Sequence, residues 1–166
     1  MNRQWQTLTF AQLGQEQLYV VLRLRQEVFT VEQRSIYLDL DGLDQQAVHM
    51  LCTRNEQLLA YQRCLPPGLR YPESSLGRII VCPAARGRHL GEELVLRGIS
   101  YNLRTWPESD ICISAQAHLK NFYRDLGFVA QGDEYDEDGI PHLQMLYSGT
   151  SSMGTSTPSR DYGSNE

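Results

Sequence analysis

The segment at residues 77–92 constrains the fold of this chain more than any other part. It begins as an apolar run, passes Pro83, continues through a basic turn containing Gly87 and Gly91, and then takes on a helical pattern. We predict a buried strand that leads through a tight turn into a helix N-terminus. The free N–H groups and the dipole of such a terminus attract anions. The segment therefore predicts a phosphate or pyrophosphate site, and with it a phosphorylated cofactor.

The turn matches neither of the common nucleotide-binding loops. Residues 86–91, Arg-Gly-Arg-His-Leu-Gly, lack the Gly-Lys-Ser/Thr of the ATP-binding phosphate loop and the three-glycine spacing of the dinucleotide fingerprint. On these residues alone, an ordinary strand-to-helix turn is as good an interpretation as an anion site. The choice between the two depends on the rest of the chain.

Two segments resemble the GNAT superfamily of N-acetyltransferases. Residues 86–91 resemble its acetyl-CoA-binding turn, Gln/Arg-x-x-Gly-x-Gly/Ala, with His89 where the family usually has Gly. Residues 121–128, which read NFYRDLGF, resemble its Leu-Tyr-x-x-x-Gly-Phe segment. The resemblance covers roughly residues 4–147. Four segments, 24–33, 39–44, 115–119 and 137–142, resemble the ElaA-like branch of the superfamily in particular.

The resemblance implies the acyl-CoA N-acyltransferase fold and an acetyl-CoA donor. Acetyl transfer would go to a primary amine, directly within a ternary complex of donor and acceptor. ElaA-like proteins generally have no assigned acceptor, so the amine stays open. The residues that the resemblance places at the cofactor are Ile80, Val81, Arg86, Gly87, Arg88, His89, Leu90, Gly91, Gln116 and Asn121.

Tyr123 aligns with the general acid of the family, which protonates the departing thiolate. A tyrosine with the ordinary pKa of about 10 is protonated at neutral pH, and a thiol pKa of about 8.5 is close enough for a positioned hydrogen bond to assist. A base is also needed, because an alkyl amine with a pKa near 10.4 is mostly ammonium at neutral pH. His118 is the first candidate for this base, followed by His142 and Glu32, and a structural role stays open for each.

Two groups of acidic residues are interpreted as the lining of an acceptor cleft that attracts a cationic amine, with solvated loop charge as the alternative. The groups are Glu32, Asp39, Asp41 and Asp44, and later Glu134, Asp136, Glu137 and Asp138. The formal net charge of −5 argues against a nucleic-acid partner. No apolar run approaches the ~20 residues that span a bilayer, and the N-terminus lacks a signal-peptide core, so we expect a cytoplasmic protein without membrane contact.

The four cysteines include no Cys-x-x-Cys pair, so we expect no metal site and treat Cys52, Cys64, Cys82 and Cys112 as small buried hydrophobes. Hydrophobic periodicity predicts an α+β fold, with a mixed, mostly antiparallel sheet and flanking helices. Helices are expected at 15–30, 90–104 and 119–126, and strands at 5–10, 47–54, 58–65, 76–82, 111–115, 128–131 and 143–147.

The expected acetyltransferase domain spans residues 1–147, and the Ser/Thr/Gly-rich residues 148–166 are predicted to be disordered. Two other functions stay open on the sequence: a non-catalytic domain that binds or senses acyl-CoA, and a general phosphate or nucleotide binder. The sequence also leaves the oligomeric state open, with a homodimer as one arrangement.

Overall fold

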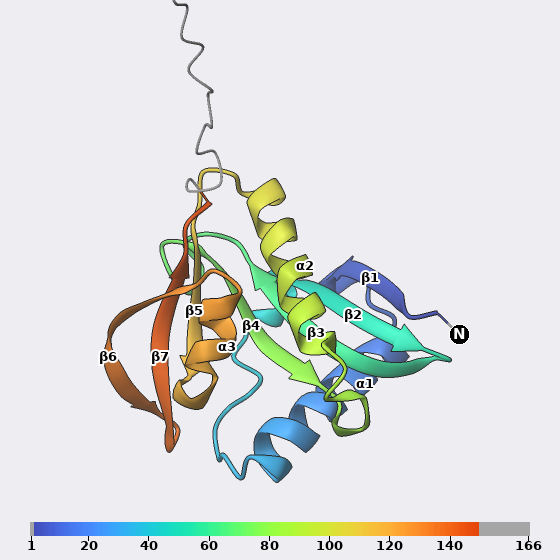
Figure 1. Cartoon of the computed structure of the whole chain (residues 1–166). Coiled ribbons are helices and arrows are strands. Elements are labelled where there is room, and N and C mark those ends of the chain that lie inside the picture. Colours follow the sequence, from blue (N-terminus) through green and yellow to red (C-terminus); the bar gives the residue numbers. More distant parts are fainter. Residues whose placement is uncertain (1, 150–166) are drawn as a thin grey trace, which may run out of the picture.

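A seven-stranded mixed sheet forms the centre of the computed structural model, which describes residues 2–149 (Figure 1). The strand order is β1-β2-β3-β4-β5-β7-β6, and only the β4–β5 pair is parallel. The strands are β1 (Gln4–Thr9), β2 (Val48–Arg54), β3 (Gln57–Leu65), β4 (Ser74–Val81), β5 (Ile111–Gln116), β6 (Val129–Glu137) and β7 (Ile140–Tyr147).

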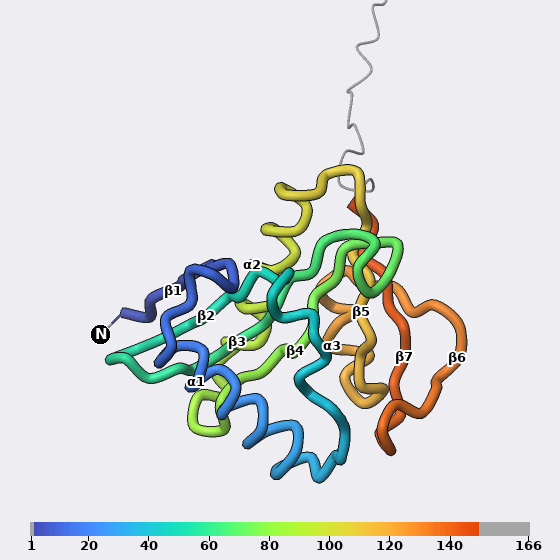
Figure 2. The backbone as a smooth tube through the Cα atoms, turned by 180° about the vertical axis from the view of Figure 1, so that it is seen from behind, coloured from blue at the N-terminus to red at the C-terminus, as the bar shows by residue number. Residues whose placement is uncertain are grey.

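The helices cover both faces of this sheet. Helix α1 packs on one face, while α2 and α3 lie on the other, as the two opposite views show (Figures 1 and 2). The helices are α1 (Gln15–Arg25), α2 (Leu90–Thr105) and α3 (Lys120–Asp125), with the short η1 (Phe10–Gln12), η3 (Asp44–Gln46), η4 (Pro83–Ala85) and η5 (Ala117–Leu119). No helix among residues 2–149 has both the length and the apolar character needed to cross a membrane.

The first predicted helix is present but changes type along its length. Helix α1 continues as the π-helical segment η2 (Gln26–Glu32). Val21, Leu24 and Val28 form the buried face of this segment and pack against β2, β3 and β4. π-helical segments are uncommon and are frequent at functional sites. The chain leaves η2 without regular structure until η3.

The C-terminal hairpin is longer than the sequence analysis expected. Strand β6 extends to Glu137 and β7 begins at Ile140, and the turn between them holds Asp138 (φ 54°) and Gly139 (φ 83°). Two positive φ values in an Asp-Gly pair are typical of the two-residue hairpin turn that matches strand twist. Hydrophobic periodicity missed the second half of β6 because this edge strand is polar and largely exposed.

The cysteines are all free, and three of them, Cys52, Cys64 and Cys112, are buried as expected, while Cys82 is half-buried. Residue 1 and residues 150–166 lie outside the described part of the chain, so most of the segment predicted to be disordered lies there as well.

Candidate functional site

Strands β4 and β5 separate soon after they meet. Their parallel pairing consists of Ser74 opposite Ile111 and Ser75 opposite Cys112. Beyond these pairs the two strands line opposite sides of a cavity of about 170 Å³. Within residues 2–149, the β5-facing edge of β4 therefore has no strand partner beyond Ser75, and its backbone groups are available to an extended ligand.

A β-bulge changes the course of β4 inside this region. The register against β3 shifts by one residue between Tyr61 and Arg63, and Arg78 has a φ of 52°. A non-glycine residue in the left-handed region is uncommon, and bulges next to functional sites redirect side chains. Here the bulge directs the Arg78 guanidinium to Asp39, with 2.7 Å between Nε and Oδ1, while the residue also lines the cavity.

The turn between β4 and α2 has the backbone of an anion site. Gly87 has a φ of 75° and His89 a φ of 57°, so His89 takes the left-handed conformation that Gly usually supplies in the family. No side chain caps α2, and the first-turn N–H groups of residues 90–92 have no helical partner. The side chain of Arg88 is exposed beside them.

Arg86, also predicted to bind the cofactor, makes a different contact. Its Nε donates to the carbonyl of Val81 at 3.0 Å, and its Nη1 lies 2.9 Å from the carboxylate of Glu32. Glu32, a candidate base, is thus held in an ion pair at the turn. The side chains of Ile80 and Val81 pack into cores on opposite faces of the sheet, and neither residue lines the cavity.

Tyr123 lies at the bottom of the cavity on α3. Its ring is buried and meets the ring of Phe128 edge-on, with centroids 5.8 Å apart. Burial raises the pKa of Tyr123, so the phenol is protonated at neutral pH. Gln116 also lines the cavity and donates from Nε2 to Oε1 of Gln33 at 3.0 Å, whereas Asn121 is exposed on the outer side of α3.

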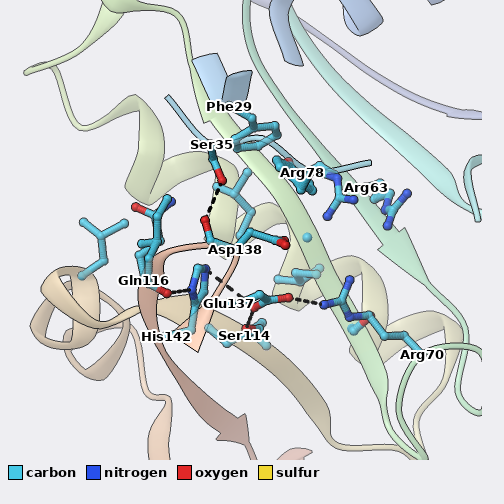
Figure 3. Close-up of a pocket in the computed structure, with 18 of the residues that line it drawn as sticks. Phe29, Ser35, Arg63, Arg70, Arg78, Ser114, Gln116, Glu137, Asp138 and His142 are labelled. Atoms are coloured by element: carbon cyan, nitrogen blue, oxygen red, sulfur yellow. Dashed lines mark hydrogen bonds and ion pairs between the residues drawn. The ribbon is translucent and has the colours of Figure 1, made fainter. Parts of the chain in front are cut away.

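A polar cluster from β5, β6 and β7 forms another wall of the cavity. Ser114 donates to the carboxylate of Glu137 at 2.5 Å, and Arg70 reaches the same carboxylate at 2.9 Å. His142 Nδ1 lies 2.8 Å from the Ile140 carbonyl, and its Nε2 lies 3.7 Å from Glu137 (Figure 3). The sequence analysis ranked His118 ahead of His142, but His118 is exposed on η5 and does not line the cavity.

The acidic residues at 39–44 do not form the cleft that the sequence analysis expected. Their carboxylates pair with three arginines and do not line the cavity. The ionic cluster consists of Asp39, Asp41, Asp44, Arg25, Arg63 and Arg78. Arg63 and Arg78 of this cluster line the cavity and its carboxylates do not, so this wall offers guanidinium groups to a ligand although the cluster as a whole is formally neutral.

Asp44 is the centre of the ionic cluster, because it accepts hydrogen bonds from both Arg25, at 2.8 Å, and Arg63, at 2.9 Å. Burial alone would raise the pKa of Asp44, but the two guanidinium groups outweigh it and hold the pKa below its ordinary value. The sequence holds one signal of this cluster that the sequence analysis did not use: Arg25 lies among the apolar residues of α1, and the structure buries it completely. A buried arginine requires paired carboxylates.

Comparisons with known proteins agree with this geometry. The chain matches the model of an acetyltransferase (GNAT) domain over residues 12–148. It is 45% identical over 148 residues to a UPF0039 protein of Synechocystis, covering 89% of this chain and 96% of that protein. It is 40% identical over 144 residues to the Escherichia coli protein ElaA, covering 86% of this chain and 94% of ElaA.

Two solved structures are similar along nearly their whole length. The crystal structure of E. coli ElaA matches with a TM-score of 0.83 at 38% identity, covering 89% of this chain and 100% of ElaA. An acyl-CoA N-acyltransferase from Pseudomonas aeruginosa matches with a TM-score of 0.82 at 39% identity, covering 87% of this chain and 99% of that chain. The predicted fold class is therefore confirmed.

Proposed function

Because this chain belongs to the GNAT family of acetyltransferases, in its ElaA-like branch, we propose that it transfers an acetyl group from acetyl-CoA to a primary amine, directly within a ternary complex. The observation that carries this proposal is the gap between β4 and β5, which is lined by Tyr123, together with the turn at residues 86–91 that follows the end of β4. An extended pantetheine arm can pair with the free edge of β4, as an added strand would.

The cofactor contacts follow from this placement. The backbone of Ile80 and Val81 would bind the pantetheine arm, and the amides of residues 87–91 would bind the pyrophosphate. Arg88 is better placed than Arg86 to add a phosphate contact, because Arg86 is already paired with Glu32. Gln116 would reach the arm from β5, whereas the exposed Asn121 has a weaker claim.

In the transfer step, the nitrogen of the neutral amine attacks the thioester carbonyl carbon. The carbon–nitrogen bond forms, the carbon–sulfur bond breaks, and the leaving thiolate takes the proton of the Tyr123 hydroxyl. Burial raises the pKa of Tyr123, which weakens it as an acid. The same environment also disfavours the thiolate anion, so burial raises the pKa of both partners; the transfer moves the negative charge from sulfur to the Tyr123 oxygen, which regains a proton from solvent when the products leave.

His142 is the best-placed base for the amine proton. Its Nδ1 donates to the Ile140 carbonyl, which leaves the Nε2 lone pair free to accept a proton. The Glu137 carboxylate lies 3.7 Å from Nε2 and would stabilise the imidazolium that forms. His118 has neither the cavity position nor a comparable partner, so we propose His142 in its place.

Thermal unfolding with acetyl-CoA, coenzyme A and ATP tests the cofactor site. A ligand present at about 100 times its Kd stabilises the fold by ~2.7 kcal/mol, which raises the Tm by several degrees. We expect this shift with both coenzyme A species and not with ATP. Equal shifts with ATP would favour a general nucleotide binder, and no shift with any of the three would overturn the proposal.

Thiol release in the presence of a panel of amines then tests the transfer itself. Amine-dependent release of coenzyme A is the expected result. Strong acetyl-CoA binding without transfer to any amine would instead favour the non-catalytic acyl-CoA-binding domain.

A further inference from the structure

Two walls of the cavity carry ionic side chains of opposite sign, each already paired with a counter-charge. Arg63 and Arg78 form the first, which we call the guanidinium wall, and Glu137, Ser114 and His142 form the second, the carboxylate wall. Figure 3 shows the two arginines close together, with the three residues of the carboxylate wall grouped apart from them. A ligand between these walls meets a cationic group at one end and an anionic group at the other.

Arg78 keeps part of its guanidinium for a ligand. Its Nε lies 2.7 Å from the Asp39 carboxylate without forming a hydrogen bond, and its Nη2 donates to the Asp39 carbonyl at 2.9 Å and to the Asp41 carboxylate at 3.3 Å. Among the described residues, no acceptor bonds its Nη1. The Tyr37 ring, 5.5 Å from its central carbon, supports the guanidinium from one side. Arg78 is thus held in place by contacts that leave one pair of donors unused.

Arg63 contributes a second, buried guanidinium group to this wall. It is 1% exposed, and its Nε has no hydrogen-bond partner among residues 2–149. Its terminal nitrogens bind Asp41 and Asp44. A buried donor without a partner is uncommon and indicates a site that an anion nearby would favour.

The carboxylate wall offers complementary chemistry. The Glu137 carboxylate accepts from Ser114 and Arg70, and His142 Nε2 lies on its other side. An ammonium group of the acceptor would be attracted to Glu137, and its proton could then pass to His142 Nε2. Ser114 also bonds the Tyr135 hydroxyl at 2.5 Å, which fixes this wall in position.

We propose that the acceptor is a small amine that also carries a carboxylate, such as an amino acid. Its carboxylate binds the Nη1 group of Arg78, and its amine lies at Glu137 and His142. This inference rests on the proposed function, because it names the substrate class of the same site. It adds a carboxylate to the cationic amine that the acidic residues of the sequence had indicated: Asp39, Asp41 and Asp44 are paired with arginines, whereas Glu137 and Asp138 line the cavity as expected.

Matched pairs of amines test the inference on the unaltered protein. The pairs are glycine with methylamine, β-alanine with ethylamine, and 4-aminobutyrate with propylamine, each compared by kcat/KM per neutral amine. One charge-assisted hydrogen bond corresponds to about tenfold or more in kcat/KM. We expect at least one amino carboxylate to exceed its alkylamine by this factor. If every alkylamine equals or exceeds its partner, or no probe reacts although acetyl-CoA binds, the inference is overturned.

Two further experiments test whether the anionic group is a carboxylate and whether Arg78 binds it. If 2-aminoethylphosphonate is preferred to β-alanine, the carboxylate assignment fails. In Arg78→Gln, the KM for the amino carboxylate should rise about tenfold or more relative to the KM for its matched alkylamine, whereas an equal change in both contradicts the assignment. Arg78→Lys serves if the Gln variant does not fold, with the same selective rise in KM expected. Arg104→Gln, at the exposed end of α2, is the control.

These experiments distinguish a failure of the proposed acceptor class from a failure of the proposed acetyltransferase function. Acetyl-CoA binding is measured first, by the Tm shift. Loss of that binding counts against the proposed function. Normal binding with a preference for alkylamines counts against the acceptor class alone.

Discussion

The carboxylate of Glu32 lies 2.9 Å from the guanidinium of Arg86 and joins the π-helical segment η2 to the turn before α2. Both side chains are nearly half exposed, and Arg86 also bonds the Val81 carbonyl at the end of β4. The pair therefore places the negative charge of Glu32 beside the proposed pyrophosphate site. It also occupies Arg86, one of the two arginines of that site.

Glu32→Gln should tighten acetyl-CoA binding severalfold at low ionic strength, because it removes a negative charge and frees Arg86 for phosphate. The free energy of unfolding should change by less than about 1 kcal/mol, as for other exposed ion pairs. Isothermal titration and urea denaturation measure the two quantities. Glu27→Gln removes an exposed pair with Arg23, at 2.8 Å, and is the control. Weaker binding in Glu32→Gln would show that the pair orders the turn instead.

Tyr123→Phe should lower kcat by about a hundredfold or more, as loss of a general acid does, with KM for acetyl-CoA nearly unchanged. The ring packing against Phe128 remains, so stability should change by less than about 1 kcal/mol. Steady-state kinetics and thermal unfolding provide the measurements. Tyr101→Phe, which keeps its edge-on contact with Trp106, is the matched control. Full activity in Tyr123→Phe would remove the acid assignment.

Asp44→Asn should destabilise the fold by about 3–5 kcal/mol, because it leaves Arg25 and Arg63 buried with one counter-charge fewer. Urea denaturation measures the change. Asp125→Asn, which alters an exposed pair with Arg124, should cost less than about 0.5 kcal/mol. Similar stability of Asp44→Asn and the original protein would mean that the ionic cluster contributes little to the fold.

Stability should fall in acid in two steps. His49 is buried between the Asp44 carbonyl, at 2.9 Å, and the Tyr61 hydroxyl, at 2.7 Å, and burial lowers its pKa. Its stabilisation is complete above the unfolded pKa of about 6.5 and declines below it, by up to ~1.4 kcal/mol per pH unit. Asp41 and Asp44, whose folded pKa values are lowered, add a loss below about pH 3.9.

Urea denaturation between pH 4.5 and 8, at constant ionic strength, measures the first step. His49→Gln should flatten the slope between pH 4.5 and 6.5, because it removes the titrating group. A slope that persists in this variant would assign the first step to another group.

Gly98→Ala should destabilise the fold by about 1–3 kcal/mol, although alanine is normally the better helix former. A Cβ at this position would lie 2.5 Å from Nε2 of Gln62, which is fully buried and donates to the Leu94 carbonyl at 2.6 Å. Ser100→Ala, on the exposed side of the same helix, should change stability little. Thermal unfolding compares the two variants, and a stabilised Gly98→Ala would mean that Gln62 moves aside easily.

The fold followed from the sequence because its strongest signals are local. The apolar run before Pro83, the turn at Gly87 and the helix that begins at Leu90 appear where the sequence placed them. The Asp138-Gly139 turn is also a local signal, and it was missed because the exposed strand before it does not alternate between apolar and polar residues.

The site was harder to predict because its groups come from distant segments. Glu137 meets Arg70 and Ser114 only through the sheet order and the packing of a loop, neither of which hydrophobic periodicity reports. The acidic residues near position 40 misled the interpretation, since the charge of a carboxylate in the sequence says nothing of its partner. Their partner Arg63 lies on β3, far along the chain.

The short contact between β4 and β5 divides the sheet into two parts, β1–β4 and β5–β7–β6. Among the described residues, the two parts pair only at Ser74 and Ser75. A pantetheine arm between the two parts would form the missing hydrogen bonds and so connect one part of the sheet to the other. The substrate would then be a structural part of the sheet for as long as it is bound. Amide protons of Ile79 and Ile113, one in each part, should exchange together and more slowly once acetyl-CoA is present.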